Sequence, residues 1–342
     1  MKILADYSKD ELLDLVSSLP KFRAKQIFDA IIQAKDWVET TIPKKMYEEL
    51  KEEYILKPVA IYEIYEAKDG TKKYLLKLHD NNIIECVFLK QNYGNTICMS
   101  TQVGCRMGCK FCASTTGGLI RNLTAGEMLS SIAVLNADNG KCSERNFTNI
   151  VLMGSGEPFD NFDNVVKFLR LITGEGFNVS ERNISLSTCG LVDKIYEFMK
   201  LNFNVTLCIS LHASTDEYRK SIMPIAFKYT IDEIAKAVKD YSSYSKRRVV
   251  LEYCLIKGVN DSFEDCKRLS NIFKGVLCHF NVICLNPKDD KLQATTKKEA
   301  YAFINKLNEL GLSASLRRSQ GADIGGACGQ LRAKRLEQDT KE

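Results

Sequence analysis

The sequence is short of the residues that several classes of protein need. It has only three histidines in 342 residues, so a His-rich zinc, copper or non-haem iron centre is not expected. No apolar run approaches the roughly 18 residues of a membrane-spanning helix, and charged residues interrupt the N-terminal segment where a signal peptide needs an apolar core. These absences predict a protein that does not cross a membrane and stays in the cytoplasm.

Low proline and an ordinary balance of residue types exclude unstructured and fibrous classes. The chain has 6 Pro and 20 Gly, with 45% hydrophobic and 27% charged residues, which is typical of a globular protein and not of a disordered or collagen-like one. The length suits one large domain with an appendage, or two domains.

Cysteine, by contrast, is abundant. Thirteen cysteines are many for a chain in a reducing compartment, where they indicate metal or redox chemistry before structural disulfides. An odd number also fits a complete disulfide framework poorly. With so few histidines, thiolates are the expected ligands of any metal.

The net charge of +5 is unevenly distributed. Residues 219–250 carry eight basic and three acidic side chains, and residues 313–335 carry five and one. Such local excess permits binding of a polyanion such as a nucleic acid, although a solvated surface gives the same pattern.

The first ninety residues change from a helical to a β-rich pattern. Ser8 and Glu11 form a capping box before a first helix, and residues 22–32 form a second amphipathic run. From about residue 55 to 90, alternating segments separated by polar turns predict a small antiparallel sheet or an extended connector.

After residue 95, strand-like and helix-like runs alternate six times before a last strand. This order predicts a parallel sheet covered by helices, and six units fall short of the eight that close a full barrel. Ligands of such folds bind at the carboxyl ends of the strands. The expected strands are 96–103, 149–154, 184–188, 205–212, 248–256, 280–286 and 313–318, and the expected helices are 124–138, 161–173, 191–201, 230–242, 262–275 and 296–310.

The first of these strands runs into a C-x3-C-x2-C loop formed by Cys105, Cys109 and Cys112. Three thiolates at this spacing can hold one iron-sulfur cube and leave one iron open to a small molecule. The alternatives are a zinc site completed by a distant ligand such as Cys142 or His279, or buried cysteines without a metal.

With this motif the chain resembles the radical S-adenosylmethionine (radical SAM) superfamily and, within it, the RlmN/Cfr family of RNA methyltransferases. The resemblance extends over nearly the whole sequence. The segments that carry it are PKFRAKQIFDAI (20–31), CMSTQVGCRMGCKFCAS (98–114), LMGSGEPFDN (152–161), SLHASTDEYRKSIMPI (210–225) and ACGQLR (327–332).

The resemblance implies an α/β fold, a partial six-unit (βα)6 radical SAM barrel with a small N-terminal helical domain and a β-rich connector. The boundaries expected are residues 1–54 for the helical RNA-binding domain and 55–94 for the connector. The barrel would then span 95–318, followed by a C-terminal loop and tail at 319–342 that carry a catalytic cysteine.

The same resemblance assigns roles to particular residues. It implies a 4Fe-4S cluster held by the three cysteines of the loop. It implies two S-adenosylmethionine (SAM) molecules per turnover, held at strand ends. The SAM contacts would be Gly156, Glu157, Ser187, Ser210, Leu211, His212 and Asn286. Read without the resemblance, Glu157 is equally a solvated loop acid and His212 a hydrogen-bonded strand-end histidine.

Catalysis would rest on Cys328, Cys98 and Glu85. In the family, the position of Cys328 is methylated and then linked covalently to RNA, the position of Cys98 resolves that link as a disulfide, and the position of Glu85 is the proposed proton acceptor. From residue type alone, both cysteines could be small buried apolar residues and Glu85 an ordinary strand carboxylate. Glycines around Cys328 indicate a loop able to move a thiol to a distant site.

The implied reaction is methylation of C2 of an adenosine in 23S rRNA and in tRNA. C2 is electron-poor, so direct transfer of a methyl cation is unsuitable and a radical route is required. An electron donor such as flavodoxin or ferredoxin is expected, and the enzyme is expected to act as a monomer. Candidate phosphate contacts are Lys21, Arg23, Lys25, Arg247, Arg248, Arg317, Arg318, Arg332, Lys334 and Arg335.

Three alternatives remain at this stage: a Cfr-type C8 methyltransferase, a different radical SAM enzyme, and a non-enzymatic cysteine-rich RNA-binding or zinc protein. Pro158 favours the C2 branch, and a different radical enzyme gives no reason for the Cys98 and Cys328 pair. The chain departs from the family pattern at Cys189, Ser155 and Gly325–Gly326, which affects cofactor packing and the Cys328 loop but no proposed ligand.

Overall fold

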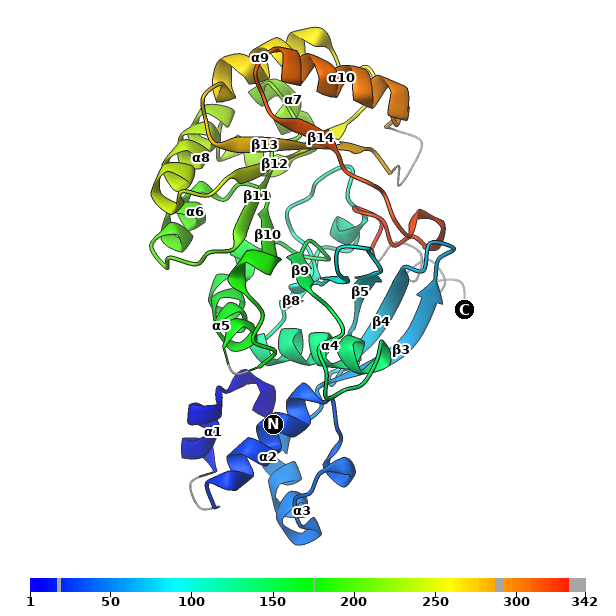
Figure 1. Cartoon of the computed structure of the whole chain (residues 1–342), viewed down its shortest axis with the longest axis vertical. Coiled ribbons are helices and arrows are strands. Elements are labelled where there is room, and N and C mark those ends of the chain that lie inside the picture. Colours follow the sequence, from blue (N-terminus) through cyan, green and yellow to red (C-terminus); the bar gives the residue numbers. More distant parts are fainter. Residues whose placement is uncertain (17–19, 175, 287–291, 332–342) are drawn as a thin grey trace.

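The N-terminal helices begin at the residues that the sequence indicates. A computed structural model describes residues 1–16, 20–174, 176–286 and 292–331. Helix α1 (Lys9–Leu15) starts at a capping box in which the Ser8 side chain accepts from the Glu11 N–H and the Glu11 side chain accepts from the Ser8 N–H. Helices α2 (Phe22–Ile32) and α3 (Lys44–Glu53) follow, and all three lie at one end of the molecule (Figure 1).

This helical region is fastened to the rest of the chain. Strand β1 (Lys2–Ile3) pairs in parallel with β2 (Tyr54–Ile55). The Gly126 N–H donates to the Asp6 carboxylate at 2.6 Å. A Cβ at Gly126 would lie 2.5 Å from the Ala5 carbonyl carbon, so the backbones meet only because residue 126 is glycine.

One ten-stranded sheet contains both the β-rich segment and the barrel. Its order is β14-β13-β12-β11-β10-β9-β6-β5-β4-β3, antiparallel from β3 to β6 and parallel from β6 onward. The β-rich segment therefore extends the barrel sheet. The antiparallel strands are β3 (Val59–Glu66), β4 (Lys72–Leu78) and β5 (Ile83–Leu89). The parallel strands are β6 (Thr96–Cys98), β9 (Asn149–Leu152), β10 (Ile184–Thr188), β11 (Thr206–Ser210), β12 (Val249–Leu255), β13 (Cys278–Cys284) and β14 (Ala314–Leu316).

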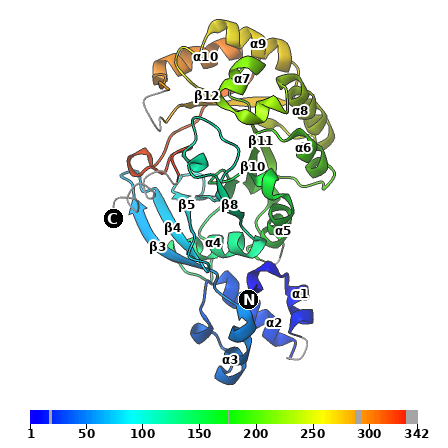
Figure 2. The same ribbon diagram turned by 180° about the vertical axis from the view of Figure 1, so that it is seen from behind.

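Helices cover the outer side of the curved parallel sheet, as Figure 2 also shows from behind. The alternation confirms the expected partial barrel with six units. The covering helices are α4 (Ala125–Asp138), α5 (Phe162–Thr173), α6 (Val192–Met199), α8 (Ile231–Ser245), α9 (Phe263–Phe273) and α10 (Lys297–Glu309). No helix in the described part of the chain has both the length and the apolar character to cross a membrane.

Two features differ from the sequence expectation. The single strand expected at 96–103 is divided into β6 and β7 (Gln102–Gly104), and β7 pairs with β8 (Leu119–Asn122) in a separate ribbon. The chain leaves the main sheet because the Ser100 hydroxyl donates to the Glu85 carbonyl at 2.6 Å and accepts from the Ser155 N–H at 2.9 Å.

An additional helix, α7 (Asp216–Ile222), follows β11 and was not expected. Short 3-10 helices complete the fold: η1 (Leu4–Asp6), η2 (Trp37–Glu39), η3 (Ala113–Thr115), η4 (Pro158–Asn161), η5 (Glu181–Asn183), η6 (Pro224–Phe227) and η7 (Ala322–Ile324).

Candidate active site

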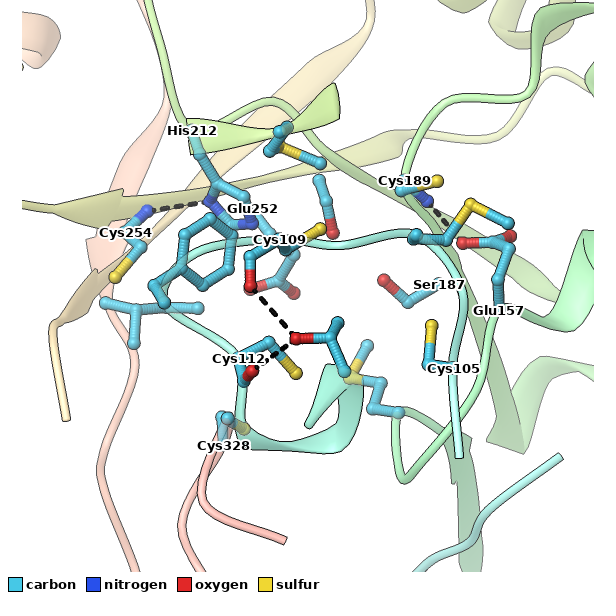
Figure 3. Close-up of a pocket in the computed structure, with 18 of the residues that line it drawn as sticks. Cys105, Cys109, Cys112, Glu157, Ser187, Cys189, His212, Glu252, Cys254 and Cys328 are labelled. Carbon is cyan, nitrogen blue, oxygen red and sulfur yellow. Dashed lines mark hydrogen bonds between the residues drawn. The ribbon is translucent and has the colours of Figure 1, made fainter. Parts of the chain in front are cut away.

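A cavity lies where the parallel strands end. Its walls come from the cysteine loop, from the segments that follow the strands, and from the C-terminal loop (Figure 3). Ten of the residues expected as cluster ligands, SAM contacts or catalytic groups line it: Cys105, Cys109, Cys112, Gly156, Glu157, Ser187, Ser210, His212, Asn286 and Cys328.

The cysteine loop holds its shape through backbone contacts. The Thr115 hydroxyl donates to the Cys112 carbonyl at 2.9 Å, and the Lys110 N–H donates to the Ile222 carbonyl at 2.9 Å. Burial raises the pKa of Cys105 to about 12 and also raises that of Cys109. Thiols in this environment stay protonated until a metal displaces the proton.

The donor set fits an iron-sulfur cluster better than a zinc ion. Among the described residues, no three His, Cys, Asp or Glu side chains form a group that could hold a metal ion. The cysteines of a cube bind different irons, so they need only line a common cavity. The distant zinc ligands considered above, Cys142 and His279, do not line it, and both ring nitrogens of His279 contact the hydroxyls of Ser313 and Ser315.

A glycine turn after β9 delivers a buried carboxylate. Gly156 has φ +109°, and a Cβ there would lie 2.7 Å from the Gln102 Cβ. The Glu157 carboxylate accepts the Cys189 N–H at 2.7 Å and the Phe159 N–H at 3.1 Å. Burial raises its pKa, and an ammonium group in the cavity would favour its ionised form. This environment fits the amino group of SAM.

His212 stands in the cavity as a neutral ring. Its Nδ1 accepts the Cys254 N–H at 3.0 Å, which leaves the proton on Nε2. Burial, with the nearby Arg219 charge, lowers the pKa of His212 to about 3. Its backbone is left-handed, with φ +54°, and its ring meets Phe111 edge-on at 4.8 Å between centroids.

The other strand-end residues divide into two groups. Ser187 and Ser210 line the cavity from β10 and β11. The Leu211 side chain instead lies fully buried in the main hydrophobic core and is not among the lining residues. A contact from Leu211 to SAM would therefore have to come from its backbone.

The C-terminal loop places Cys328 at the cavity. The Gly329 carbonyl accepts the Ala113 N–H at 2.7 Å, and the Asn286 amide donates to the Cys328 carbonyl at 3.3 Å. Further back, the Asp69 carboxylate accepts the Gly321 N–H at 3.1 Å. The loop is thus anchored both at the cysteine loop and at the turn between β3 and β4.

Cys98 and Glu85 lie beside the cavity, not in it. Cys98 of β6 is buried against Val87 and Leu331. Its pKa is raised by burial and then by the Cys328 thiol, with which it interacts electrostatically. Glu85 of β5 is also buried and forms an ion pair with Lys73 at 3.4 Å. Cys98 pairs with Val87 across the two strands, and Val87 is two residues after Glu85, so the side chains of Cys98 and Glu85 lie on the same face of the sheet. All thirteen cysteines are free.

Of the lining residues that were not singled out for the site, four carry ionisable side chains: Cys189, Glu252, Cys254 and Arg317. Cys254 lies near the end of β12, where the strand-end rule could have identified it, whereas Glu252 is in the middle of that strand. Arg317, expected as a phosphate contact, pairs with Glu252 at 3.4 Å, and its pKa is raised first by the Cys328 thiol.

The remaining candidate phosphate contacts are dispersed. Arg248 directly precedes β12, and Arg247 contacts Thr206 at the start of β11, so both lie at the strand ends opposite the cavity. Arg318 is exposed. The N-terminal candidates are Lys21, Arg23 and Lys25, of which Arg23 contacts Gln26. Arg332, Lys334 and Arg335 lie outside the described residues.

Comparison with known proteins gives consistent matches. Residues 99–269 match the model of the Radical SAM superfamily. A probable dual-specificity RNA methyltransferase RlmN from Clostridium perfringens is 49% identical over 340 residues, covering 97% of each chain. A protein of the same description from Lachnospira eligens is 46% identical over 338 residues, covering 96% of this chain and 95% of the relative.

A solved structure is similar throughout. It is a radical SAM methyltransferase from Sphaerobacter thermophilus, which has 37% sequence identity and a TM-score of 0.92. The match covers 98% of this chain and 100% of the other.

Proposed function

The chain belongs to the RlmN family of radical SAM RNA methyltransferases, and on that premise we propose that it methylates C2 of an adenosine in 23S rRNA and of the adenosine 3′ of the anticodon in tRNA. The observation that carries the proposal is that one cavity unites the three cysteines, the strand-end polar residues and Cys328. A thiol that is not a cluster ligand, placed beside the cluster site, suits a reaction that passes through a modified cysteine.

Each part of the cavity has a task in this reaction. Cys105, Cys109 and Cys112 would hold a 4Fe-4S cluster, which supplies one electron for reductive cleavage of SAM. Glu157 would bind the SAM ammonium, and the neutral His212 would offer its Nε2–H as a donor. Burial around the cavity excludes water from a reactive radical.

Cys328 is the proposed methyl carrier. Its sulfur would lose its proton and take a methyl group from one SAM, which would leave as S-adenosylhomocysteine. A hydrogen atom would then leave that methyl group, with a second SAM and one electron yielding methionine and 5′-deoxyadenosine. The carbon would then bridge Cys328 and C2 of the adenine, with Glu85 as the proposed acceptor of the C2 proton, and the remaining unpaired electron would pass back to the oxidised cluster. Such covalent catalysis divides one difficult step into easier ones.

Cys98 is the proposed resolving thiol. Its thiolate would attack the sulfur of Cys328 and break the bond from that sulfur to the bridging carbon. The carbon would take up a proton to become the methyl group of the RNA, and a Cys98–Cys328 disulfide would be left for reduction. Both cysteines are free in the structure, as a transient disulfide requires. Burial raises the pKa of Cys98, so a neighbouring base or cation must favour its thiolate during the attack. Arg317, which interacts with both thiols, is placed to do so.

We further propose that the enzyme works as a monomer in the cytoplasm, with flavodoxin or ferredoxin as electron donor. Its basic side chains would contact RNA phosphates, while the target base is extruded into the cavity.

A trapping experiment tests the roles of the two catalytic cysteines. Anaerobically reconstituted Cys98→Ala should accumulate a covalent protein–RNA adduct, and Cys328→Ala should form neither adduct nor methylated product. The matched control is Cys86→Ala, which removes a fully buried thiol on the neighbouring strand β5 and should turn over without an adduct. Absence of an adduct in Cys98→Ala, with cluster content verified, would contradict the proposed resolving role.

A further inference from the structure

Arg219 is the largest side chain that the fold buries completely. It projects from α7 and donates hydrogen bonds to backbone carbonyls of three separate segments of the chain. Its Nη2 donates to the carbonyls of Cys189 at 2.6 Å and Ser210 at 3.2 Å, and its Nε donates to that of Leu211 at 3.2 Å. Its Nη1 donates to the Tyr229 carbonyl at 3.4 Å. Arg219 therefore ties the ends of β10 and β11 together behind the cavity.

The hydrogen bonds of Arg219 are satisfied, but its charge is compensated only in part. Burial lowers the pKa of Arg219, and the Asp216 carboxylate, on the same helix, raises it without forming an ion pair with the guanidinium. Within the described ranges of the chain, no carboxylate forms an ion pair with it. Arginine is almost never fully buried unless it is paired, because burying an uncompensated cation is costly. Carbonyl dipoles lower that cost without cancelling the charge. Arg219 does not itself line the cavity, but an anion bound there would compensate part of its charge at a distance.

The cysteine loop is the neighbour of this cation. The carbonyl of Ile222, at the end of α7, accepts the Lys110 N–H, and a Cβ at Gly108 would lie 3.2 Å from the Pro224 ring. Cys109 and Cys189 pack in one buried cluster with Ile222 at the end of α7, and both cysteines line the cavity in Figure 3. Three thiolates and a 4Fe-4S core carry net negative charge, and reduction adds one more.

We propose that Arg219 is a positioning residue with two effects: its fork of donors fixes the strand ends that hold SAM, and its charge stabilises the reduced cluster. The inference rests on the proposed cluster at Cys105, Cys109 and Cys112. Net charge and hydrogen bonding near an iron-sulfur cluster are known determinants of its reduction potential. Removing a buried cation should make reduction harder.

Two substitutions separate the effects. Arg219→Gln removes the charge, whereas Arg219→Lys keeps the charge but replaces the planar fork with a single nitrogen. Arg268→Gln is the control, because it removes the same charge from α9 on the outer layer, where Arg268 pairs with Asp265. For each reconstituted protein we would measure iron content, the one-electron midpoint potential by dithionite titration followed by EPR without SAM, and the SAM dissociation constant.

The expected results differ between variants. Arg219→Gln should bind a cluster whose equilibrium constant for reduction is lower by about tenfold, a shift of about 59 mV to more negative potential for one electron. Arg219→Lys should keep a potential near that of the wild type and bind SAM about tenfold more weakly. Arg268→Gln should match the wild type in both measurements.

Several outcomes would overturn the inference. A potential in Arg219→Gln equal to that of the wild type removes the electrostatic effect, and unchanged SAM affinity in both variants removes the positioning effect. Failure of both variants to fold assigns Arg219 to stability alone. If the wild type itself binds no cluster, the proposed function fails as well, whereas a wild-type cluster with an insensitive potential refutes only the role of Arg219.

Discussion

Gly156 allows a clean test of the turn that delivers Glu157 to the cavity. An alanine at this position meets two separate penalties. Its φ of +109° is unfavourable for an L side chain, and the new Cβ would lie 2.7 Å from the Gln102 Cβ and 2.8 Å from the Gln102 nitrogen. Two other glycines each carry only one penalty. Gly117, at φ +89°, has no atom within 4 Å of its Cβ position, and Gly154 lacks the positive φ but would place a Cβ 2.6 Å from the Met99 carbonyl.

These differences set the expected magnitudes. A left-handed backbone costs about 1–2 kcal/mol for a residue with a Cβ, so Gly117→Ala should lower the free energy of unfolding by about that amount. Overpacking against a fixed backbone costs roughly 1–3 kcal/mol, which is the expectation for Gly154→Ala. Gly156→Ala should combine both and lose roughly 2–5 kcal/mol.

Urea unfolding followed by far-ultraviolet circular dichroism measures the three free energies under one condition. SAM binding to the reconstituted protein gives a second readout. Gly154→Ala and Gly156→Ala should displace the Glu157 turn and weaken SAM binding, whereas Gly117→Ala should leave SAM binding unchanged. If Gly156→Ala is no more destabilising than Gly117→Ala, the close approach to Gln102 does not hold the turn, and the reasoning is refuted.

Two further predictions concern pH and salt. Burial lowers the pKa of His212 to about 3 from an ordinary 6.5. Between these two pH values the unfolded state binds a proton at this residue and the folded state does not. The free energy of unfolding therefore falls as the pH drops from 6.5 toward 3. His212→Asn, which keeps an acceptor for the Cys254 N–H and tolerates the left-handed backbone, should flatten that fall; an unchanged profile would assign it to other groups. RNA affinity should decrease steeply between about 50 and 200 mM salt. A flat response in filter binding would remove phosphate contacts by basic residues from the account.

The fold was largely predictable because its signals are local and periodic. The capping box at Ser8 and Glu11 marks the start of α1, and the alternation of strands and helices after residue 95 gives the partial barrel. The division of the first barrel strand was not predictable. It depends on the Ser100 hydroxyl contacting Glu85 and Ser155, partners that are 15 and 55 residues away in the sequence.

The candidate site was predictable as far as the strand-end rule and the family motifs extend. Residues directly after strands, such as Glu157 and His212, line the cavity as expected. Cys98 and Glu85 instead lie beside it on one face of the sheet, a relation that needs the register of β5 and β6. Arg219 belongs to a conspicuous motif, yet only the structure shows that its side chain is fully buried and, among the described residues, forms no ion pair.

The most direct test of the proposed function is nucleoside mass spectrometry. Anaerobically reconstituted protein would be incubated with SAM, a reductant, and unmodified 23S rRNA or tRNA, with Cys328→Ala as the inactive control. The proposed function predicts 2-methyladenosine in both RNAs with the wild type and in neither with Cys328→Ala. Formation of 8-methyladenosine, or no methylation by protein with a verified cluster, would contradict it.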